Sequence, residues 1–132
     1  QYLPGRKKWK LTSSHNADKV SSAVDGNLGT RFDTGTAMVP GMWFQIELPE
    51  TMEVSGLRLD SAGSVLDYPS GYEVTVSVDG KSCSSSLVKG QGSQPLTEIY
   101  FGGVKAKFIK IIQTGRRPGK YWSIHDLQIY GK

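Results

Sequence analysis

The amino-acid sequence predicts an all-β domain, organised as a sandwich or a barrel. Two segments place apolar residues at every second position, which is the pattern of a strand that buries one face. Clusters of Gly, Pro, Ser and Asp separate short apolar segments at close intervals, and no longer window keeps a helical period. Short strands joined by frequent turns are typical of sandwiches and barrels.

The first half of the chain supplies one helical turn and two strands. ADKVSSAVDG, at 17–26, has room for a single turn of helix. MWFQIEL, at 42–48, is expected to be a strand with Phe44, Ile46 and Leu48 on its buried face, because alternate side chains of a strand point the same way. SGLRLD follows as a second short strand.

The second half supplies four more strands. YEVTVSVDG, at 72–80, alternates with Tyr72 and three valines on one face. Its last two residues, Asp79 and Gly80, predict a tight hairpin turn, because this pair readily adopts the backbone angles that such turns require. LTEIYF, KFIKIIQ and DLQIYG complete the set, and no internal repeat or linker divides the chain.

Length and composition predict a single soluble domain. The chain has 132 residues, 37% hydrophobic and 21% charged. No apolar run approaches the roughly 20 residues needed to span a bilayer. Cys83 is the only cysteine, so no intrachain disulfide can form. We expect residues 1–132 to be one module of a larger protein.

The charge pattern disfavours nucleic acid as a partner. The net charge is +4, and basic residues concentrate in RKKWK and GRRPGK. The sequence has neither a dense basic stripe nor the signature of a known nucleic-acid-binding module. The excess charge is therefore interpreted as a solvated basic face.

Catalytic motifs are absent from the sequence. The chain has two histidines and no GxSxG or HExxH motif, no phosphate-binding loop and no paired cysteines. We therefore expect a protein that is not an enzyme.

The segment AVDGNLGTRF, at 23–32, places oxygen-bearing side chains between glycines. Such a loop can direct several oxygens toward one centre, as a hard cation requires. An ordinary turn is the alternative, since Asp, Gly and Asn favour turns for backbone reasons alone.

Six motifs in order resemble the discoidin family, also called coagulation factor V/VIII (F5/8) type C domains: WKLTSS, AVDGNLGTRF, GMWFQIELPE, GYEVTVSVDGK, KFIKIIQTG and WSIHDLQIYG. The resemblance runs from about Trp9 to Gly131 and is strongest to the bacterial carbohydrate-binding modules of family 32. It implies an eight-stranded jelly-roll β-sandwich with a galactose-binding-domain-like fold, which binds ligand in loops at one end. It further implies a lectin-like accessory module of a secreted, periplasmic or cell-surface protein.

The resemblance also implies a structural calcium ion (Ca2+), bound by the 23–32 loop and an acidic residue of the last strand. The residues at the matching positions are Ser22, Asp25, Asn27, Thr30, His125 and Asp126. Asp25 and Asp126 would supply carboxylates, Thr30 a hydroxyl and a carbonyl, and the other three backbone carbonyls. The family more often has glutamate where this chain has Asp126, which puts the affinity for calcium in question. Phe32 stands where many relatives carry tryptophan.

The loops that the family uses for ligand carry aromatic and polar side chains suited to sugars. The candidate ligand-binding residues are His15, Asn16, Asp33, Asp67, Tyr68, Arg116, Arg117, Tyr121 and Trp122. The alternative for His15 is a solvent-exposed loop histidine, and the alternative for Trp122 is core packing. If the arginine pair binds ligand, an anionic glycan is favoured, since guanidinium groups suit planar anions.

We therefore expect a non-catalytic carbohydrate-binding module, linked to a catalytic domain such as a glycoside hydrolase, that binds galactose-type or amino-sugar glycans. The alternatives are a protein or membrane adhesion module and a ligand-free spacer domain. Membrane binding is disfavoured, because the membrane-binding branch of the family presents apolar loop tips and has cysteines joining its termini. The matching loop here offers only Ala37, Met38 and Val39.

Overall fold

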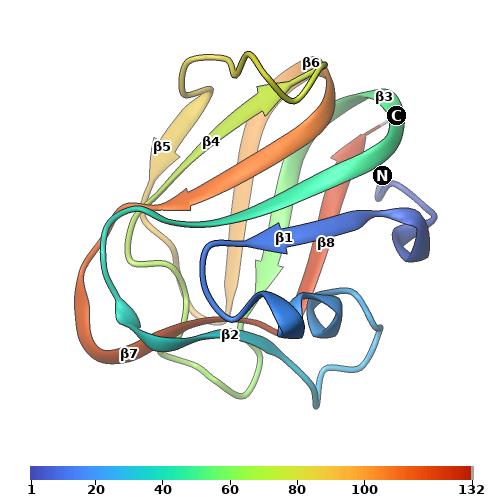
Figure 1. Ribbon diagram of the computed structural model, residues 1–132. Coiled ribbons are helices and arrows are strands. Elements are labelled where there is room, and N and C mark those ends of the chain that lie inside the picture. The colour runs from blue at the N-terminus through green and yellow to red at the C-terminus, as the bar shows by residue number, and fades with distance from the viewer. Residues whose placement is uncertain (132) are drawn as a thin grey trace.

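Two long strands organise the computed structural model, which describes residues 1–131 (Figure 1). They are β3 (Met42–Asp60) and β6 (Leu96–Gln113), and they pair with each other antiparallel along most of their length. Each strand bends over, so that one half lies in the front layer and the other half in the back layer (Figure 1).

Shorter strands complete the two layers. In the front layer, β1 (Lys10–Ser13) pairs with the first half of β3, while β4 (Tyr72–Ser77) pairs with the second half of β6 and with β5 (Val88–Gly90). In the back layer, β8 (Asp126–Gly131) pairs with the second half of β3. Together with the two-stranded ribbon described in the next paragraph, these strands make eight, which confirms the predicted β-sandwich.

A two-stranded ribbon closes one end of the sandwich. It consists of β2 (Phe32–Met38) and β7 (Arg117–Ile124), which pair antiparallel with register shifts and cross the lower end of the molecule in Figure 1. The sequence predicts loops for both segments, and those predictions are wrong. Gly, Thr and Asp residues obscure the alternation in β2, and its ladder with β7 is irregular.

Two of the predicted strand boundaries are also wrong. SGLRLD continues the strand that begins at Met42, and LTEIYF and KFIKIIQ belong to one strand. A shift in register between Glu47 and Met52 marks the bend in β3, so the chain changes layers without leaving the sheet. The predicted helical turn is confirmed as the 3-10 helix η2 (Ala17–Ala23), and a second one, η1 (Arg6–Lys8), precedes β1.

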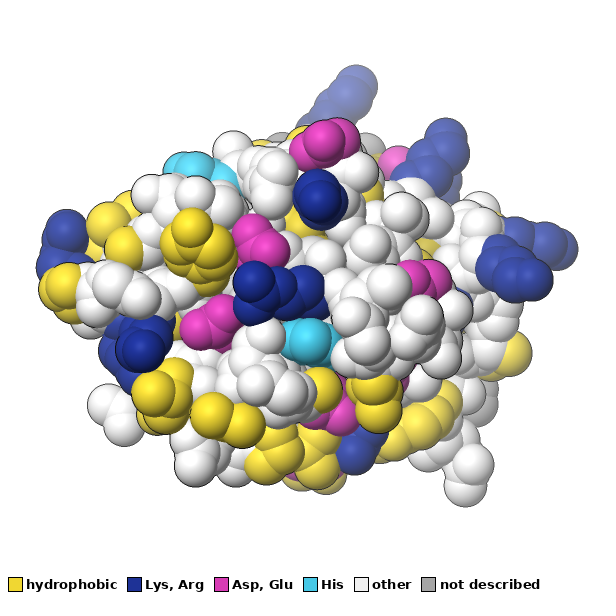
Figure 2. All heavy atoms as spheres, turned by 90° about the horizontal axis from the view of Figure 1, so that it is seen from below, with side chains coloured by type: hydrophobic (Ala, Val, Ile, Leu, Met, Phe, Trp, Pro, Cys, Tyr) yellow, Lys and Arg dark blue, Asp and Glu magenta, His cyan; other side chains and the backbone are white. Residues whose placement is uncertain are grey.

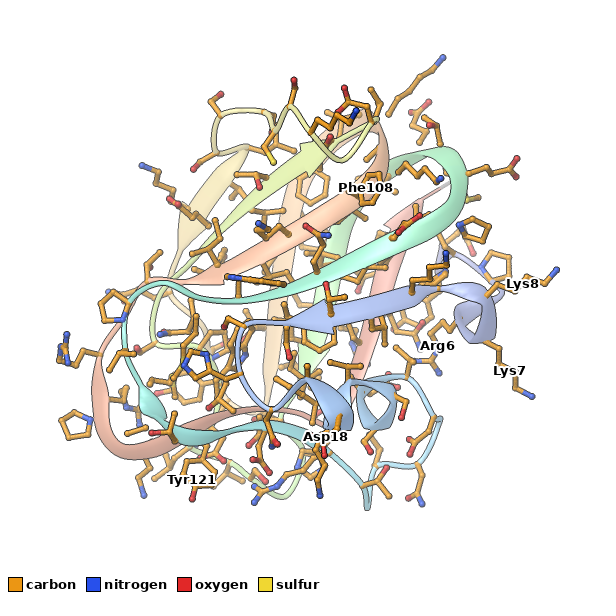
Figure 3. The ribbon with its side chains drawn as sticks, viewed as in Figure 1. Arg6, Lys7, Lys8, Asp18, Phe108 and Tyr121 are labelled. Carbon is orange, nitrogen blue, oxygen red and sulfur yellow. The ribbon has the colours of Figure 1, made fainter. Side chains whose placement is uncertain are left out.

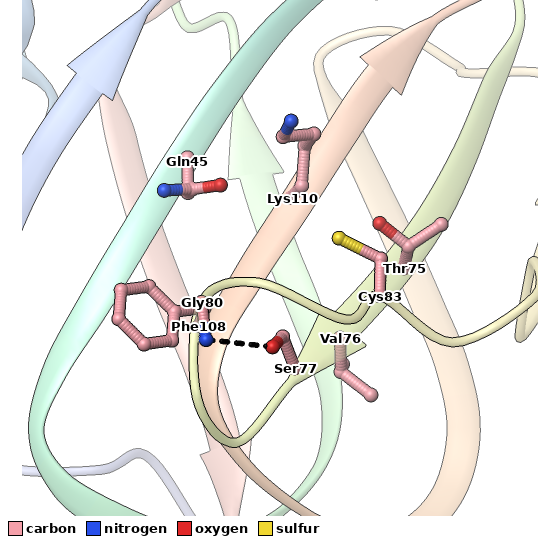
Figure 4. A pocket seen from close by; sticks show the side chains of 8 residues that line it. All are labelled: Gln45, Thr75, Val76, Ser77, Gly80, Cys83, Phe108 and Lys110. Atoms are coloured by element: carbon pink, nitrogen blue, oxygen red, sulfur yellow. Dashed lines mark hydrogen bonds between the residues drawn. The ribbon is translucent and has the colours of Figure 1, made fainter.

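The turn predicted at Asp79 and Gly80 is present, although it does not form a tight hairpin. Gly80 has a φ of 78°, but the chain continues through a loop to residue 87 before β5 pairs with β4. This loop folds over the outer face of the front layer, where Gly80 lies against the ring of Phe108 and Cys83 lines a small pocket (Figure 4). Cys83 is free and exposed.

The core forms where the inner faces of the two layers meet. Phe44, Ile46 and Leu48 are fully buried, which confirms the alternation that the sequence predicts. Phe32 and Trp122 of the ribbon close the core from below, and the Phe32 ring packs edge-on against Phe44 with centroids 5.0 Å apart. Complete burial of each large apolar side chain contributes about 1.5–3 kcal/mol to the free energy of unfolding.

The first residues of the chain lie along the last strand. The Leu3 amide donates to the Ile129 carbonyl, and the Gly131 amide donates to the Gln1 carbonyl, both at 2.8 Å. The described parts of the two ends therefore lie side by side on the back layer. No helix among residues 1–131 has the length and apolarity needed to cross a membrane.

Candidate functional site

The end of the sandwich that carries the ribbon presents a group of paired polar side chains. We call this group the loop-end cluster: it consists of Arg31, Asp33, Ser64, Asp67 and Ser123. Figure 2 shows this face, where acidic side chains lie on both sides of basic ones near the centre, with a histidine beside them.

Arg31 is the centre of the loop-end cluster. Its Nε lies 3.2 Å from the Asp33 carboxylate, and its Nη1 lies 2.7 Å from Ser64 Oγ and 3.3 Å from both Asp67 Oδ2 and Ser123 Oγ. The side chain is still 38% exposed, so part of the guanidinium faces solvent.

Sequence reasoning missed Arg31 as a functional residue. It stands two positions before Asp33 and is separated from it by the buried Phe32, which is the alternation of a strand. Recognition of residues 32–38 as a strand would have placed both charged side chains on one face.

Asn16 holds Asp33 in place. Asn16 adopts a left-handed backbone conformation, with a φ of 56°, and its amide nitrogen donates to the Asp33 carbonyl at 2.8 Å. The Asp33 carboxylate also accepts a hydrogen bond from the Gly35 amide at 2.9 Å. Both residues were predicted to bind ligand. The structure brings them together and makes Asn16 a support for the carboxylate.

The loop that carries Asp67 and Tyr68 is fastened to β7. Ser123 donates to the Asp67 carboxylate at 2.6 Å through its hydroxyl and to the Asp67 carbonyl at 2.9 Å through its amide. The guanidinium of Arg117 lies over the Tyr68 ring, 5.0 Å from its centroid. Arg117 is therefore close to the cluster, whereas its neighbour Arg116 is exposed.

His125 contacts the loop-end cluster through Ser64 and also contacts the 25–30 loop. Its Nδ1 lies 2.7 Å from the Leu28 carbonyl, which can only accept, so Nδ1 carries the proton. Its Nε2 lies 2.8 Å from Ser64 Oγ, the hydroxyl that Arg31 contacts. The side chain of His125, and not only its predicted carbonyl, thus has a structural task.

Tyr121 and Trp122, which are neighbours in β7, have opposite environments. Tyr121 is 40% exposed and projects at the loop end (Figure 3). Trp122 is fully buried, so its prediction as a ligand-binding residue is wrong and the alternative of core packing is confirmed. Strand alternation explains the difference, because Tyr121 and Ser123 share the outer face of β7 while Trp122 points inward.

His15 lies in the loop before Asn16 and is partly buried. Its Nδ1 lies 2.8 Å from Ser14 Oγ, and Ser14 in turn accepts a hydrogen bond from the Trp43 amide. The ring of His15 is thus held by its own loop and has no hydrogen bond to the charged side chains of the cluster.

Three predicted calcium ligands lie together in the 25–30 loop. The carboxylate of Asp25 accepts from the Asn27 amide at 3.0 Å and from the Thr30 hydroxyl. These hydrogen bonds, that from Thr30 first, hold the pKa of Asp25 below its ordinary value. The Thr30 hydroxyl also lies 2.9 Å from the Asn27 carbonyl oxygen. The Asp25 carboxylate is therefore hydrogen-bonded within its own loop.

Asp126, the predicted carboxylate from the last strand, is engaged elsewhere. One of its oxygens lies 2.7 Å from Arg6 Nη1, and the other lies 3.3 Å from Gln128 Nε2. Calcium would have to compete with the guanidinium for this carboxylate, so the donor set does not fit the ion as it is arranged. No group of three or more His, Cys, Asp and Glu among residues 1–131 is placed to hold a metal. The calcium site stays a prediction.

Taken together, the fold and the cluster define a β-sandwich domain that presents its polar site on loops at one end. Comparison with protein families matches residues 8–127 to the F5/8 type C domain. The chain belongs to this family, which is the discoidin family that the motifs predict. No curated protein sequence matches the chain.

Solved structures share the fold at low sequence identity. CpGH89CBM32-5 from Clostridium perfringens, in complex with GalNAc-β-1,3-galactose, has a TM-score of 0.83 and 21% identity over 99% of this chain and 100% of that one. The family 32 module of C. perfringens NanJ, in complex with galactose, has a TM-score of 0.77 and 18% identity over 97% of this chain and 96% of that one. Chitosan-binding module 2 of a Paenibacillus sp. IK-5 chitosanase/glucanase was solved in complex with chitotriose. It has a TM-score of 0.77 and 24% identity over 94% of this chain and 97% of that one.

Proposed function

We propose that the protein is a non-catalytic carbohydrate-binding module whose ligand site is the loop-end cluster together with Tyr121. One observation carries this proposal: a partly exposed guanidinium is fixed between two carboxylates on the face that also presents an exposed tyrosine. Fixed donors and acceptors suit the hydroxyls of a sugar, and an aromatic face suits its C–H surface.

The charges of the cluster favour neutral or amino sugars. Asp33 and Asp67 already surround Arg31, so an anionic group would meet two carboxylates as it approached the guanidinium. Arg117 lies on the Tyr68 ring, and Arg116 is exposed outside the cluster. Galactose-type or amino sugars are therefore the proposed ligands, in keeping with the sugars bound by the modules of similar fold.

We also propose that the module is joined to a glycan-active enzyme and works outside the cytoplasm, in a secreted, periplasmic or cell-surface protein. Modules of the same fold come from a chitosanase/glucanase and from a family 31 glycoside hydrolase. A module that binds glycan weakly would raise the local concentration of an attached catalytic domain on its substrate.

A protein or membrane adhesion module is the second candidate function. The apolar side chains that could support it are not those of the predicted loop. Met38 is fully buried and Ala37 and Val39 are partly buried, so this segment does not present the apolar tip expected of a membrane-binding loop. Leu28, Val65 and Leu66, in neighbouring loops, are exposed apolar side chains. Binding to lipid vesicles that is lost on Leu28→Ser would favour adhesion.

A glycan array probed with the domain tests the proposal, with Asp33→Asn and Tyr121→Ala as site variants. Tyr100→Ala is the matched control, because Tyr100 is 64% exposed on a strand of the back layer. We expect binding to terminal galactose-type or amino sugars that both site variants lose and the control keeps. Absence of binding, or site variants that bind as the wild type does, would overturn the proposal.

A further inference from the structure

The first segment of the chain is fastened to the last strand by Arg6. Its Nη1 donates to Asp126 Oδ1 at 2.7 Å and to the Leu127 carbonyl at 3.1 Å. The two charged side chains are only 21% and 14% exposed. Gly5, with a φ of 79°, turns the chain into η1 and so places Arg6 beside the beginning of β8 (Figure 3).

The surroundings of Arg6 include both carboxylates that a calcium ion would join. Arg6 pairs with Asp126, and it lines one open groove of about 320 Å³ together with Asp25. Arg6 is therefore paired with one predicted calcium ligand and shares a groove with another.

The 25–30 loop is also joined to the last strand without a metal. His125 donates from Nδ1 to the Leu28 carbonyl at 2.7 Å, and this bond links the centre of the loop to the residue before β8. The carboxylate of Asp25 is satisfied inside the loop by Asn27 and Thr30. The connection that a structural cation would make is thus made by the chain's own groups.

We propose that Arg6, assisted by His125, replaces the structural calcium of the fold, so that the folded domain needs no metal ion. A divalent cation at Asp126 would have to displace the guanidinium or lie beside its fixed positive charge, and both are electrostatically unfavourable. This proposal concerns the stability of the domain and does not depend on the proposed glycan ligand.

Thermal unfolding of the chelator-treated wild type, in EDTA and in millimolar CaCl2, tests the proposal. Saturation of a calcium site at 100 times its Kd would raise Tm by roughly 10 °C in a domain of this size. We expect a change of less than about 1 °C, and no heat of binding in a calorimetric titration with CaCl2. A calcium-dependent rise of about 5 °C or more would overturn the proposal.

Arg6→Gln tests the guanidinium directly, and Lys7→Gln removes the same charge from the exposed neighbour, which points away from the sandwich (Figure 3). In EDTA, Arg6→Gln should lower Tm by roughly 4 °C or more, while Lys7→Gln leaves it unchanged. Calcium should raise the Tm of Arg6→Gln, because Asp126 is then free. The proposal would be overturned if Arg6→Gln had the same Tm as the wild type in EDTA. It would also be overturned if calcium changed the Tm of the wild type and of Arg6→Gln by the same amount.

Discussion

The protein places an arginine beside acidic residues in two regions, and the two regions differ in exposure and in the number of carboxylate partners. Arg6 has one carboxylate partner, Asp126 at 2.7 Å, in a contact with little exposure. Arg31 has two, Asp33 at 3.2 Å and Asp67 at 3.3 Å, and is 38% exposed. We therefore expect the covered pair to stabilise the fold, and we propose that the open pair presents fixed hydrogen-bonding groups to a ligand.

The sequence separation of the partners supports this distinction. Arg6 and Asp126 lie 120 positions apart, so their contact holds the first segment against the last strand. Asp33 and Ser123 are already paired through the β2–β7 ladder, so the backbone near Arg31 is in place without its charges. Changes near Arg6 should therefore alter stability, and changes at Arg31 should alter glycan binding.

The largest effect is expected for Trp122→Ala, which would remove a core side chain from β7, the strand that carries Ser123 of the loop-end cluster. Trp122 is completely buried, and truncation of such a side chain costs about 3–5 kcal/mol of the free energy of unfolding. Both glycan affinity and stability should fall, as measured by urea unfolding and by calorimetric titration with the sugar found on the array.

Tyr121→Ala is the matched control for that change. Because Tyr121 is exposed, its truncation should alter the free energy of unfolding by less than about 0.5 kcal/mol while still weakening glycan binding. Equal losses of stability in the two variants would contradict the assignment of Trp122 to packing and Tyr121 to ligand.

Arg31→Gln is expected to act mainly on glycan binding. Hydrogen bonds to charged groups contribute about 1.5–3 kcal/mol, so Kd should rise roughly 10- to 100-fold in a calorimetric titration. Arg116→Gln, in the exposed loop, should leave Kd within about twofold of the wild type, since it lies outside the cluster. If the two variants bind equally well, Arg31 is not part of the site.

Asp126→Asn should show the opposite pattern. It removes the charge that pairs with Arg6 and is expected to lower the free energy of unfolding by about 1–2 kcal/mol. Glycan affinity in the folded protein should not change, because Asp126 has no contact with the loop-end cluster. A weakened Kd without loss of stability would contradict the division between the two regions.

The smallest effect is expected from Asp25 at acidic pH. Its pKa is lowered in the folded state from 3.8, mainly by the Thr30 hydrogen bond. Its contribution to stability is therefore present above pH 3.8 and is lost as the pH falls through the lower, folded-state value. Asp25→Asn should flatten the fall of Tm below pH 4, whereas Asp18→Asn, on an exposed side chain, should keep the wild-type profile. Parallel profiles for Asp25→Asn and the wild type would contradict this expectation.

The sequence by itself determined the class of fold and the part of the core that two alternating strands contribute. Alternation at period two is a local signal, so it identified the buried faces of residues 42–48 and 72–76 without knowledge of their partners. Local signals failed at Trp122, because an aromatic side chain has the same appearance in the sequence whether it lies inside or outside a strand. They also failed to show that the predicted strands around 42–60 are one continuous strand.

Only the tertiary structure decided which charges meet. The partners of Arg31 come from β2, from the loop before β4 and from β7, and the partner of Arg6 comes from the opposite end of the chain. Ion pairs depend on distances in space that no local pattern records, since the packing of the two layers brings these segments together. The same reason explains why the family resemblance implies Asp126 as a calcium ligand while the structure pairs it with Arg6.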